Sequence, residues 1–300
     1  MPSTVRAARE PREQRRGRED AGWVSVDGAR LRYRIEGSGQ PILVIGTAIF
    51  YPRIFSDTLR EQVQLVFVDL RHFGENDGSF AIDEISIQTY ADDIEHVRQT
   101  LGLGDIVILG HSVHGCIALE YARRYAEHVR GAVTTGSYPY ISDEEPSAAD
   151  RLWDAEASEE RKTLLQRNRA ALTPDVRAAL SPSERVVRVY GARAPLNWYD
   201  PTYNGDWLWE GVTTDVPVYD RLQELFETYD LAQGPGTISV PVLIAQGRYD
   251  YNAVYTLWEE HSHKLPRHTY ALFGRSAHFP SFEEPDRFDA TLLAWVRTVD

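Results

Sequence analysis

The amino-acid sequence predicts an α/β fold, in which a mostly parallel sheet is flanked by helices and carries an inserted helical cap. Two observations lead to this prediction. Short, continuous apolar runs, which are typical of strands buried on both faces, alternate along the 300-residue chain with segments of helical periodicity. Between residues 141 and 236 we find helix-like segments but no convincing buried strand, and such a stretch is too long for a loop.

The first two strands are expected on either side of Asp27-Gly28, a dipeptide typical of tight hairpin turns, because both flanking segments alternate apolar and polar residues. The later strands are expected to be buried in the middle of the sheet, since each contains a short apolar run. These segments are Pro41–Gly46, Gln64–Leu70, Asp105–Gly110, Gly131–Ser137, Pro241–Asp250 and His268–Gly274.

Helices are expected where apolar residues recur at helical spacing between these strands. The segments are Ser86–Gly104, Val113–Val129, Ala253–Leu265 and Glu284–Val299. The strand and helix pattern places the sheet domain at residues 21–140 and 237–300, and the cap at 141–236.

Composition limits the partners and the cellular setting. A net charge of −13 disfavours binding to nucleic acid. Residues 1–20 interleave arginines with acids and contain few large apolar side chains, which predicts a disordered tail; a basic arm for nucleic acid is the less favoured alternative. Cys116 is the single cysteine, and no apolar run approaches the ~20 residues of a membrane helix. We therefore expect a cytoplasmic protein without membrane contact, of undetermined oligomeric state.

A candidate nucleophile lies in the stretch ILGHSVHGC. Ser112 follows a predicted buried strand and precedes a predicted helix, and this is the context in which a sharp turn presents a catalytic serine. The common pattern Gly-x-Ser-x-Gly is altered, because His114 replaces the last glycine and Gly115 follows it. A serine in such a turn is otherwise often only a helix cap.

Two further residues support a catalytic role for Ser112. Asp250 and His278 each come just after a predicted strand, at the same edge of the sheet as Ser112. Their order along the chain, serine, acid and then histidine, is the order found in hydrolases with this kind of nucleophile turn. The sequence therefore predicts a Ser112–His278–Asp250 triad.

With these residues in place, residues 21–300 resemble the α/β-hydrolase fold with a cap. The stretch DLRHFGEND resembles the loop after the fourth strand of that family, and HFPSFEEPDRF resembles the segment around its histidine. Within the cap, Asp206–Asp215 is similar to the Trp-x-x-Trp-Glu-Gly stretch of proline iminopeptidases. The resemblance implies that Glu210 binds the free amino end of a substrate, and that Glu227 or Glu224 supplies a second acid. Trp209 ends the aromatic-rich stretch PLNWYDPTYNGDWLW, which we expect either to line an apolar substrate pocket or to form the cap's own small core. A solvated surface glutamate is the alternative for Glu210.

The resemblance also implies an oxyanion hole formed by the backbone N–H groups of Val113 and Thr47. The loop VIGTAIFYPR lacks the family's histidine, which is Ile45 here, but backbone donors do not depend on side chains. For His114 two interpretations remain: a histidine that fills space at the helix start, or one that lines the acyl pocket or tunes Ser112.

Taken together, the sequence predicts a serine hydrolase acting on a small molecule or short peptide, with a proline iminopeptidase-like aminopeptidase favoured. A carboxylesterase or lactonase is the first alternative, and a ligand-binding or non-hydrolytic protein on the same fold is the second. No cofactor or metal is expected, because His261 and His263 point to different helix faces and no phosphate-binding glycine loop is present.

Overall fold

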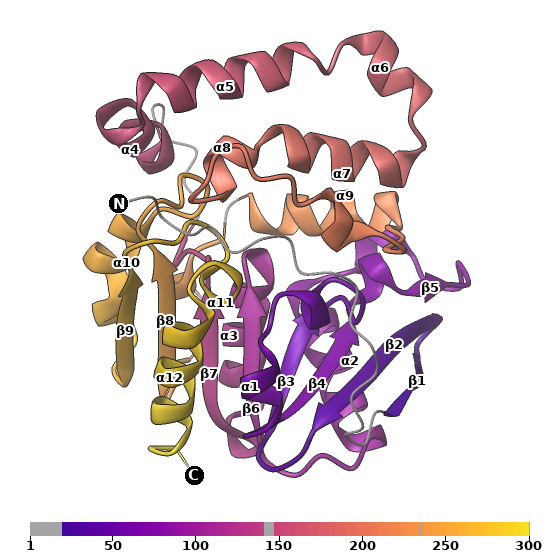
Figure 1. Ribbon diagram of the computed structural model, residues 1–300. Helices are drawn as coiled ribbons and strands as arrows, with labels where there is room; N and C mark the ends of the chain where they lie inside the picture. The colour runs from indigo at the N-terminus through magenta and orange to yellow at the C-terminus, as the bar shows by residue number, and fades with distance from the viewer. Residues whose placement is uncertain (1–19, 141–146, 228, 234–235, 300) are drawn as a thin grey trace.

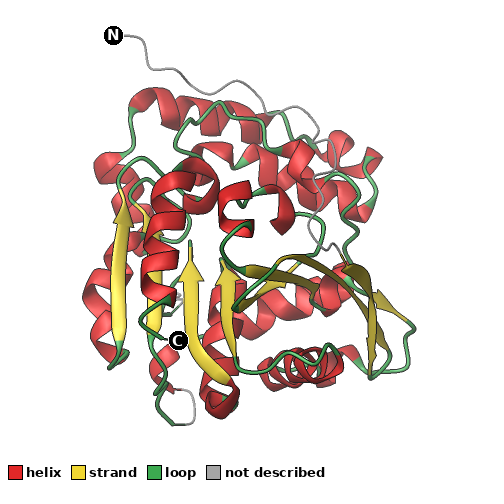
Figure 2. Cartoon of the chain, turned by 60° about the horizontal axis from the view of Figure 1, so that its bottom comes forward, coloured by secondary structure: helices red, strands yellow, loops and turns green. Residues whose placement is uncertain are grey.

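The computed structural model describes residues 20–140, 147–227, 229–233 and 236–299. Nine strands of this part form one sheet, in the order β1-β2-β4-β3-β6-β7-β8-β9, with β5 paired to β2 (Figures 1 and 2). The strands are β1 Asp20–Val26, β2 Ala29–Gly37, β3 Pro41–Gly46, β4 Gln64–Asp69, β5 Glu75–Asn76, β6 Ile106–His111, β7 Val129–Thr135, β8 Val242–Gly247 and β9 His268–Phe273. The α/β-hydrolase fold expected from the sequence is confirmed.

Strand direction follows the length of the connections. β1 and β2 are joined by a turn at Asp27-Gly28, and both residues have positive φ, so the two strands pair antiparallel. From β4 to β9 the neighbours pair in parallel, because longer crossovers join them. The two-residue strand β5, in the loop after β4, was not predicted.

Side-chain alternation builds a core on each face of the sheet. In β3, Leu43 and Ile45 face one core and Ile42 and Val44 face the other. The first core is covered by α2 (Ile87–Thr100), α3 (Val113–Arg124) and α10 (Tyr255–His261), and the second by α1 (Asp57–Arg60) and α12 (Pro285–Val296). A short helix, α11 (Pro280–Glu283), precedes α12.

The predicted helix Val113–Val129 is too long. Helix α3 ends at Arg124, and Tyr125 leaves the helical region with φ −121° and ψ 42°. Val129 instead begins β7 and pairs with Ile106 of β6. Strand pairing together with burial of this β-branched side chain, which is 6% exposed, determines its structure.

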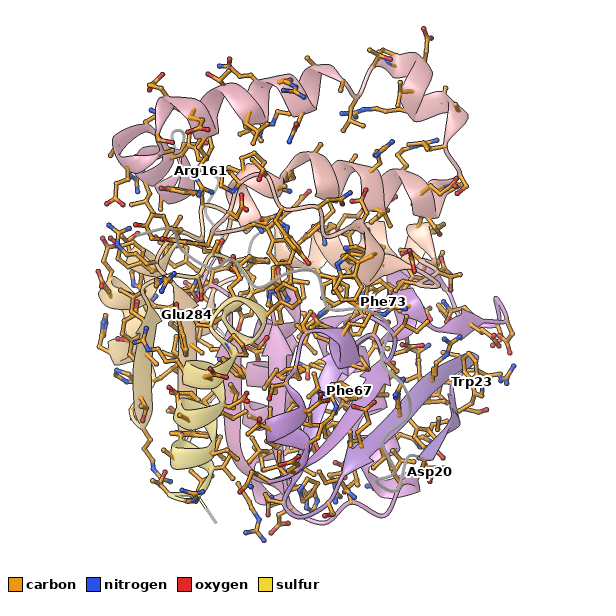
Figure 3. The ribbon with its side chains drawn as sticks, viewed as in Figure 1. Asp20, Trp23, Phe67, Phe73, Arg161 and Glu284 are labelled. Atoms are coloured by element: carbon orange, nitrogen blue, oxygen red, sulfur yellow. The ribbon has the colours of Figure 1, made fainter. Side chains whose placement is uncertain are left out.

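The insertion between β7 and β8 lies over the carboxyl ends of the parallel strands (Figure 1). Its helices are α4 Ala148–Glu156, α5 Glu159–Ala170, α6 Pro174–Ala179, α7 Pro182–Ala192, α8 Ala194–Asn197 and α9 Val216–Phe226. Arg161, on the inner side of α5 in Figure 3, donates to the carbonyls of Pro195, Trp198 and Tyr199. These bonds tie α5 to the segment that contains α8. None of the helices in the described ranges is both long and apolar enough to span a bilayer.

The crossing of β6 and α3 leaves no room for side chains at two glycines. A Cβ atom added to Gly110 would overlap the carbonyl oxygen of His114 and lie 2.7 Å from the amide nitrogen of Gly115. A Cβ atom on Gly115 would meet the side chains of Thr134 and Ser137. The two glycines therefore let the helix start directly on the sheet.

The first prediction concerns Gly110. Because the overlapping atoms belong to the backbone, Gly110→Ala forces α3 away from β6 and lowers the free energy of unfolding by about 3 kcal/mol. Gly104→Ala is the matched control, since its Cβ atom would meet no atom within 4 Å. Urea unfolding of both variants measures the difference, and equal stability would contradict the tight crossing.

Candidate active site

Ser112 stands in the turn between β6 and α3 with a backbone that non-glycine residues rarely adopt. Its φ is 58° and its ψ is −134°, and its N–H donates to the carbonyl of Thr135 at 3.0 Å. Such a conformation costs of order 1–3 kcal/mol and persists only where the surroundings hold it. Here β6 and α3 hold it from both sides, so the hydroxyl is presented at the start of a helix.

The candidate acid and base form a buried, hydrogen-bonded pair. Nδ1 of His278 lies 2.8 Å from Oδ2 of Asp250. The other oxygen of Asp250 accepts the N–H groups of Asn252 at 2.9 Å and Ala253 at 2.8 Å. A carboxylate held in this way accepts the proton on Nδ1 of the imidazole, which leaves Nε2 as the basic nitrogen.

His278 is held from several directions. Its N–H donates to the carbonyl of Asn197 in the cap at 3.0 Å, and its carbonyl accepts from Nε2 of His111 at 2.9 Å. Its own Nε2 is buried and makes no hydrogen bond with any described residue, Ser112 included. Ser112, Asp250 and His278 follow β6, β8 and β9, so the parallel sheet brings all three candidates to one edge.

Glu283, for which no role was predicted, supports the loop that contains His278. Its carboxylate accepts the N–H of Ala277 at 2.8 Å and the N–H of Tyr199, in the cap, at 2.5 Å. Burial raises the pKa of Glu283 to about 8, against the opposing effect of these backbone donors. This side chain therefore joins the histidine loop to the cap.

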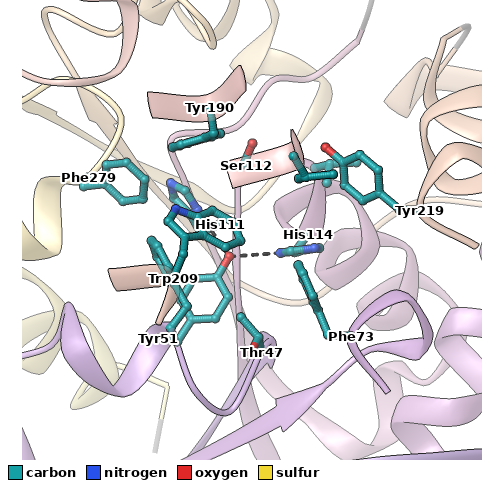
Figure 4. A pocket seen from close by; sticks show the side chains of 13 residues that line it. Thr47, Tyr51, Phe73, His111, Ser112, His114, Tyr190, Trp209, Tyr219 and Phe279 are labelled. Carbon is teal, nitrogen blue, oxygen red and sulfur yellow. Dashed lines mark hydrogen bonds between the residues drawn. The ribbon is translucent and has the colours of Figure 1, made fainter. Parts of the chain in front are cut away.

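The two predicted oxyanion donors lie beside the serine. Thr47 follows Gly46, whose φ of 137° turns the chain at the end of β3, and Asp69 fixes the loop by accepting the N–H of Ala48 at 2.7 Å. Thr47, which is labelled in Figure 4, and Val113 both line the pocket that contains Ser112. Their oxyanion role stays a prediction that this placement allows.

The pocket around Ser112 is largely aromatic, and among the described residues neither a carboxylate nor a Lys or Arg side chain lines it. Its lining residues are Thr47, Phe50, Tyr51, Phe73, His111, Ser112, Val113, His114, Val186, Tyr190, Trp209, Tyr219 and Phe279. Trp209 and His114, two of the predicted substrate contacts, are therefore at the pocket.

The two predicted acidic contacts lie elsewhere. Glu210 and Glu227 are exposed and do not line the pocket, and Glu224 is exposed as well. The charge of Glu210 acts on Arg53, a core residue that donates to the carbonyl of Leu208 at 2.6 Å. Glu210 thus faces the junction between core and cap rather than the serine.

His114 belongs to a chain of buried hydrogen bonds in the wall of the pocket. The hydroxyl of Tyr51 lies 2.9 Å from Nδ1 of His114, as the dashed line in Figure 4 marks, and 3.3 Å from Nδ1 of His111. Nε2 of His114 lies 3.1 Å from Nε2 of His72. Tyr51 therefore bridges the residues on either side of Ser112, from the loop that carries Thr47.

Hydrogen-bond chemistry fixes the direction of this chain. His111 must donate from Nε2, because its partner is the carbonyl of His278, and its Nδ1 therefore accepts from Tyr51. The tyrosine hydroxyl has one proton, so it accepts from Nδ1 of His114, and Nε2 of His114 accepts from His72. Nδ1 of His72 is left without a partner among the described residues. Three neutral imidazoles satisfy this order.

Burial keeps these imidazoles neutral. It lowers the pKa of His114 to about 3 and holds those of His72 and His111 well below the usual value, with neighbouring histidines adding to both effects. His72 was not predicted from the sequence as a site residue, although it follows the end of β4 as Asp250 follows the end of β8. In the described ranges, no cluster of three or more His, Cys, Asp or Glu side chains is arranged to hold a metal ion.

Removing the bridging hydroxyl should slow hydrolysis. In Tyr51→Phe the loop that carries Thr47 loses its bond to both sides of the serine turn, so we expect kcat to fall about tenfold to hundredfold with KM little changed. Tyr121→Phe is the control, because it removes an equally buried hydroxyl, bonded to Glu95 at 2.8 Å on the far side of α3. An unchanged kcat in Tyr51→Phe would show that the bridge only fills space.

The neutral histidines predict a loss of stability in acid. Their folded pKa values lie below the unfolded value near 6.5, so stability is complete above that pH and falls as the unfolded chain takes up protons. Each histidine should cost about 1.4 kcal/mol between about pH 7.5 and about pH 5.5. The unfolding free energy of His114→Gln should fall less steeply as the pH is lowered, because its unfolding takes up about one proton fewer. His96→Gln, at an exposed position, should keep the wild-type slope. Equal slopes would contradict a neutral His114.

Comparison with known proteins agrees with this architecture. A family model described as alpha/beta hydrolase fold matches residues 33–285. The AB hydrolase superfamily protein YclE of Bacillus subtilis (strain 168) is 36% identical over 280 residues, covering 93% of this chain and 99% of YclE. A proline iminopeptidase of Saccharolobus solfataricus is 23% identical over 85% of this chain and 84% of its own, and the bifunctional esterase/perhydrolase DCH of Acinetobacter calcoaceticus is 25% identical over 80% and 84%. The chain therefore belongs to the alpha/beta hydrolase fold family and is a hydrolase.

Proposed function

We propose that the protein is a serine esterase that cleaves carboxylic esters of small molecules. The observation that carries this proposal is the pocket at Ser112, where aromatic rings and neutral imidazoles surround the serine and no carboxylate is present. Such a lining suits the apolar part of an ester and offers no counter-charge to an ammonium group.

The proposed reaction uses the three strand-end residues. Nε2 of His278 takes the proton of the Ser112 hydroxyl as the serine oxygen attacks the ester carbonyl, while Asp250 holds the resulting imidazolium. The backbone N–H groups of Val113 and Thr47 stabilise the negative oxygen. His278 then protonates the departing alcohol, an acyl-enzyme forms on Ser112, and water activated by the same histidine releases the acid.

An aminopeptidase of the proline iminopeptidase type is the second candidate. The stretch Asp206–Asp215 and the proline iminopeptidase relatives favour it. That activity needs a carboxylate facing the substrate's free amino group, and Glu210 and Glu227 lie outside the pocket. The observed arrangement therefore supports the esterase more strongly.

Two measurements test the proposal. A fluorophosphonate probe should label wild-type protein and not Ser112→Ala, because only an activated serine reacts. Short-chain 4-nitrophenyl esters should be hydrolysed at least about a hundredfold faster, in kcat/KM, than proline 4-nitroanilide, since the pocket lacks a partner for an ammonium group.

Glu210→Gln distinguishes the two candidates. Under the esterase proposal the variant keeps the wild-type kcat/KM on both substrates. A specific loss on proline 4-nitroanilide would favour the aminopeptidase instead. Absence of labelling at Ser112 in folded protein would contradict both.

A further inference from the structure

Arg193 is a cationic side chain with few hydrogen-bond partners among the described residues. It follows α7 and is half-buried, and its Nη2 atom donates to Oδ1 of Asn252 at 2.6 Å. No carboxylate of the described part of the chain lies within ion-pair distance of its guanidinium. A guanidinium has five N–H donors, so most of its hydrogen-bonding capacity remains available.

Two buried arginines of this protein, Arg71 and Arg161, make more hydrogen bonds than Arg193 does. Arg71 makes two bonds to Asp93, at 2.5 and 2.8 Å, and Arg161 donates to three backbone carbonyls. A purely structural role at position 193 would call for a similar set of partners. The hydrogen bond to Oδ1 of Asn252 instead orients the side chain, while no carboxylate of the described residues pairs with its charge.

The charge of Arg193 acts on three tyrosines. Tyr138, Tyr190 and Tyr219 are half-buried, and none of their hydroxyls has a hydrogen-bond partner among the described residues. Burial raises the pKa of all three phenols, and the positive charge of Arg193 opposes that rise in each. The guanidinium and three unbonded O–H donors thus share one neighbourhood.

This neighbourhood adjoins the serine. Tyr190 and Tyr219 line the pocket with Ser112, and Figure 4 shows them on different sides of it. Arg193 does not line that pocket itself, but it follows the last residue of α7 and its N–H donates to the carbonyl of Tyr190 at 3.0 Å. Asn252, which binds Arg193, also donates its N–H to Asp250. The charge is therefore fixed at one position relative to the candidate triad.

We propose that Arg193, together with the hydroxyls of Tyr190 and Tyr219, forms a subsite for a carboxylate group on the ester substrate. This inference rests on the proposed esterase function and names its substrate class: an ester whose reacting carbonyl lies at Ser112 and whose far end is an anionic carboxylate. A guanidinium binds a carboxylate through two parallel N–H bonds, and a phenol O–H adds a third donor. Residues 141–236 carry 18 acidic residues against 10 basic ones, Arg193 included, so a cation without a carboxylate partner among the described residues is unusual in this segment.

The test uses matched pairs of substrates that differ only in the far charge. Mono-4-nitrophenyl glutarate and its methyl ester place the charge on the acyl side. 4-Acetoxybutanoate and its methyl ester place it on the alcohol side. We expect wild-type protein to favour the charged member of at least one pair by about tenfold in kcat/KM, the usual size of a charge-assisted bond. The pair that shows the preference identifies the side on which the carboxylate lies.

The variants separate binding from structure. Arg193→Gln should abolish the preference while leaving kcat/KM on the neutral methyl esters within about twofold, and Arg193→Lys should retain part of it. Arg188→Gln, on the exposed side of α7 beside Asp206, should leave the preference at the wild-type value.

Two results would overturn the inference. One is the lack of a preference for the charged ester in both pairs. The other is an equal loss on charged and neutral esters in Arg193→Gln, which would mark Arg193 as a structural tie to Asn252. Hydrolysis of the neutral esters and labelling of Ser112 report on the proposed esterase separately, so its failure is distinguishable from failure of the subsite.

Discussion

The close approach of β6 to α3 is the constraint on which the rest of the site depends. Gly110 and Gly115 let the helix begin against the sheet, and this contact holds Ser112 at a positive φ that an exposed loop would not keep. Once the serine is fixed there, its two flanking histidines are fixed as well. His111 then reaches the carbonyl of His278, and His114 reaches Tyr51.

The buried imidazoles and the Tyr51 hydroxyl in the wall of the pocket form one directed chain of hydrogen bonds. The chain from His72 to the carbonyl of His278 works only if all three imidazoles are neutral and the tyrosine proton points towards His111. This order explains how three histidines can lie beside a serine hydrolase site without competing for the role of base. Only Nε2 of His278 combines burial, a carboxylate on its other nitrogen and a place at the strand ends.

The sequence predicted the sheet and the placement of Ser112, Asp250 and His278 well, because buried strands have distinctive apolar runs and their ends meet at one edge. It failed at Val129, where strand pairing prevailed over helical spacing. It could not reveal Tyr51, His72 or Glu283, because their roles come from partners distant in sequence: 63 residues separate Tyr51 from His114 and 84 separate Tyr199 from Glu283. The cap was the hardest part to predict. Similarity to a family motif indicated Glu210 as a substrate contact, whereas in the structure its charge acts on Arg53.

The way the cap is attached has a consequence for how this protein could change over generations. Arg53, in the sheet domain, fastens the cap through the carbonyls of Trp207 and Leu208, and Arg161 of α5 joins cap segments to one another through the carbonyls of Pro195, Trp198 and Tyr199. Every residue type has a carbonyl, so substitutions along these segments leave the fastening intact. Mutations that reshape the roof over Ser112 can therefore accumulate without detaching it, and new substrate preferences become accessible while the candidate residues Ser112, Asp250 and His278 stay constant.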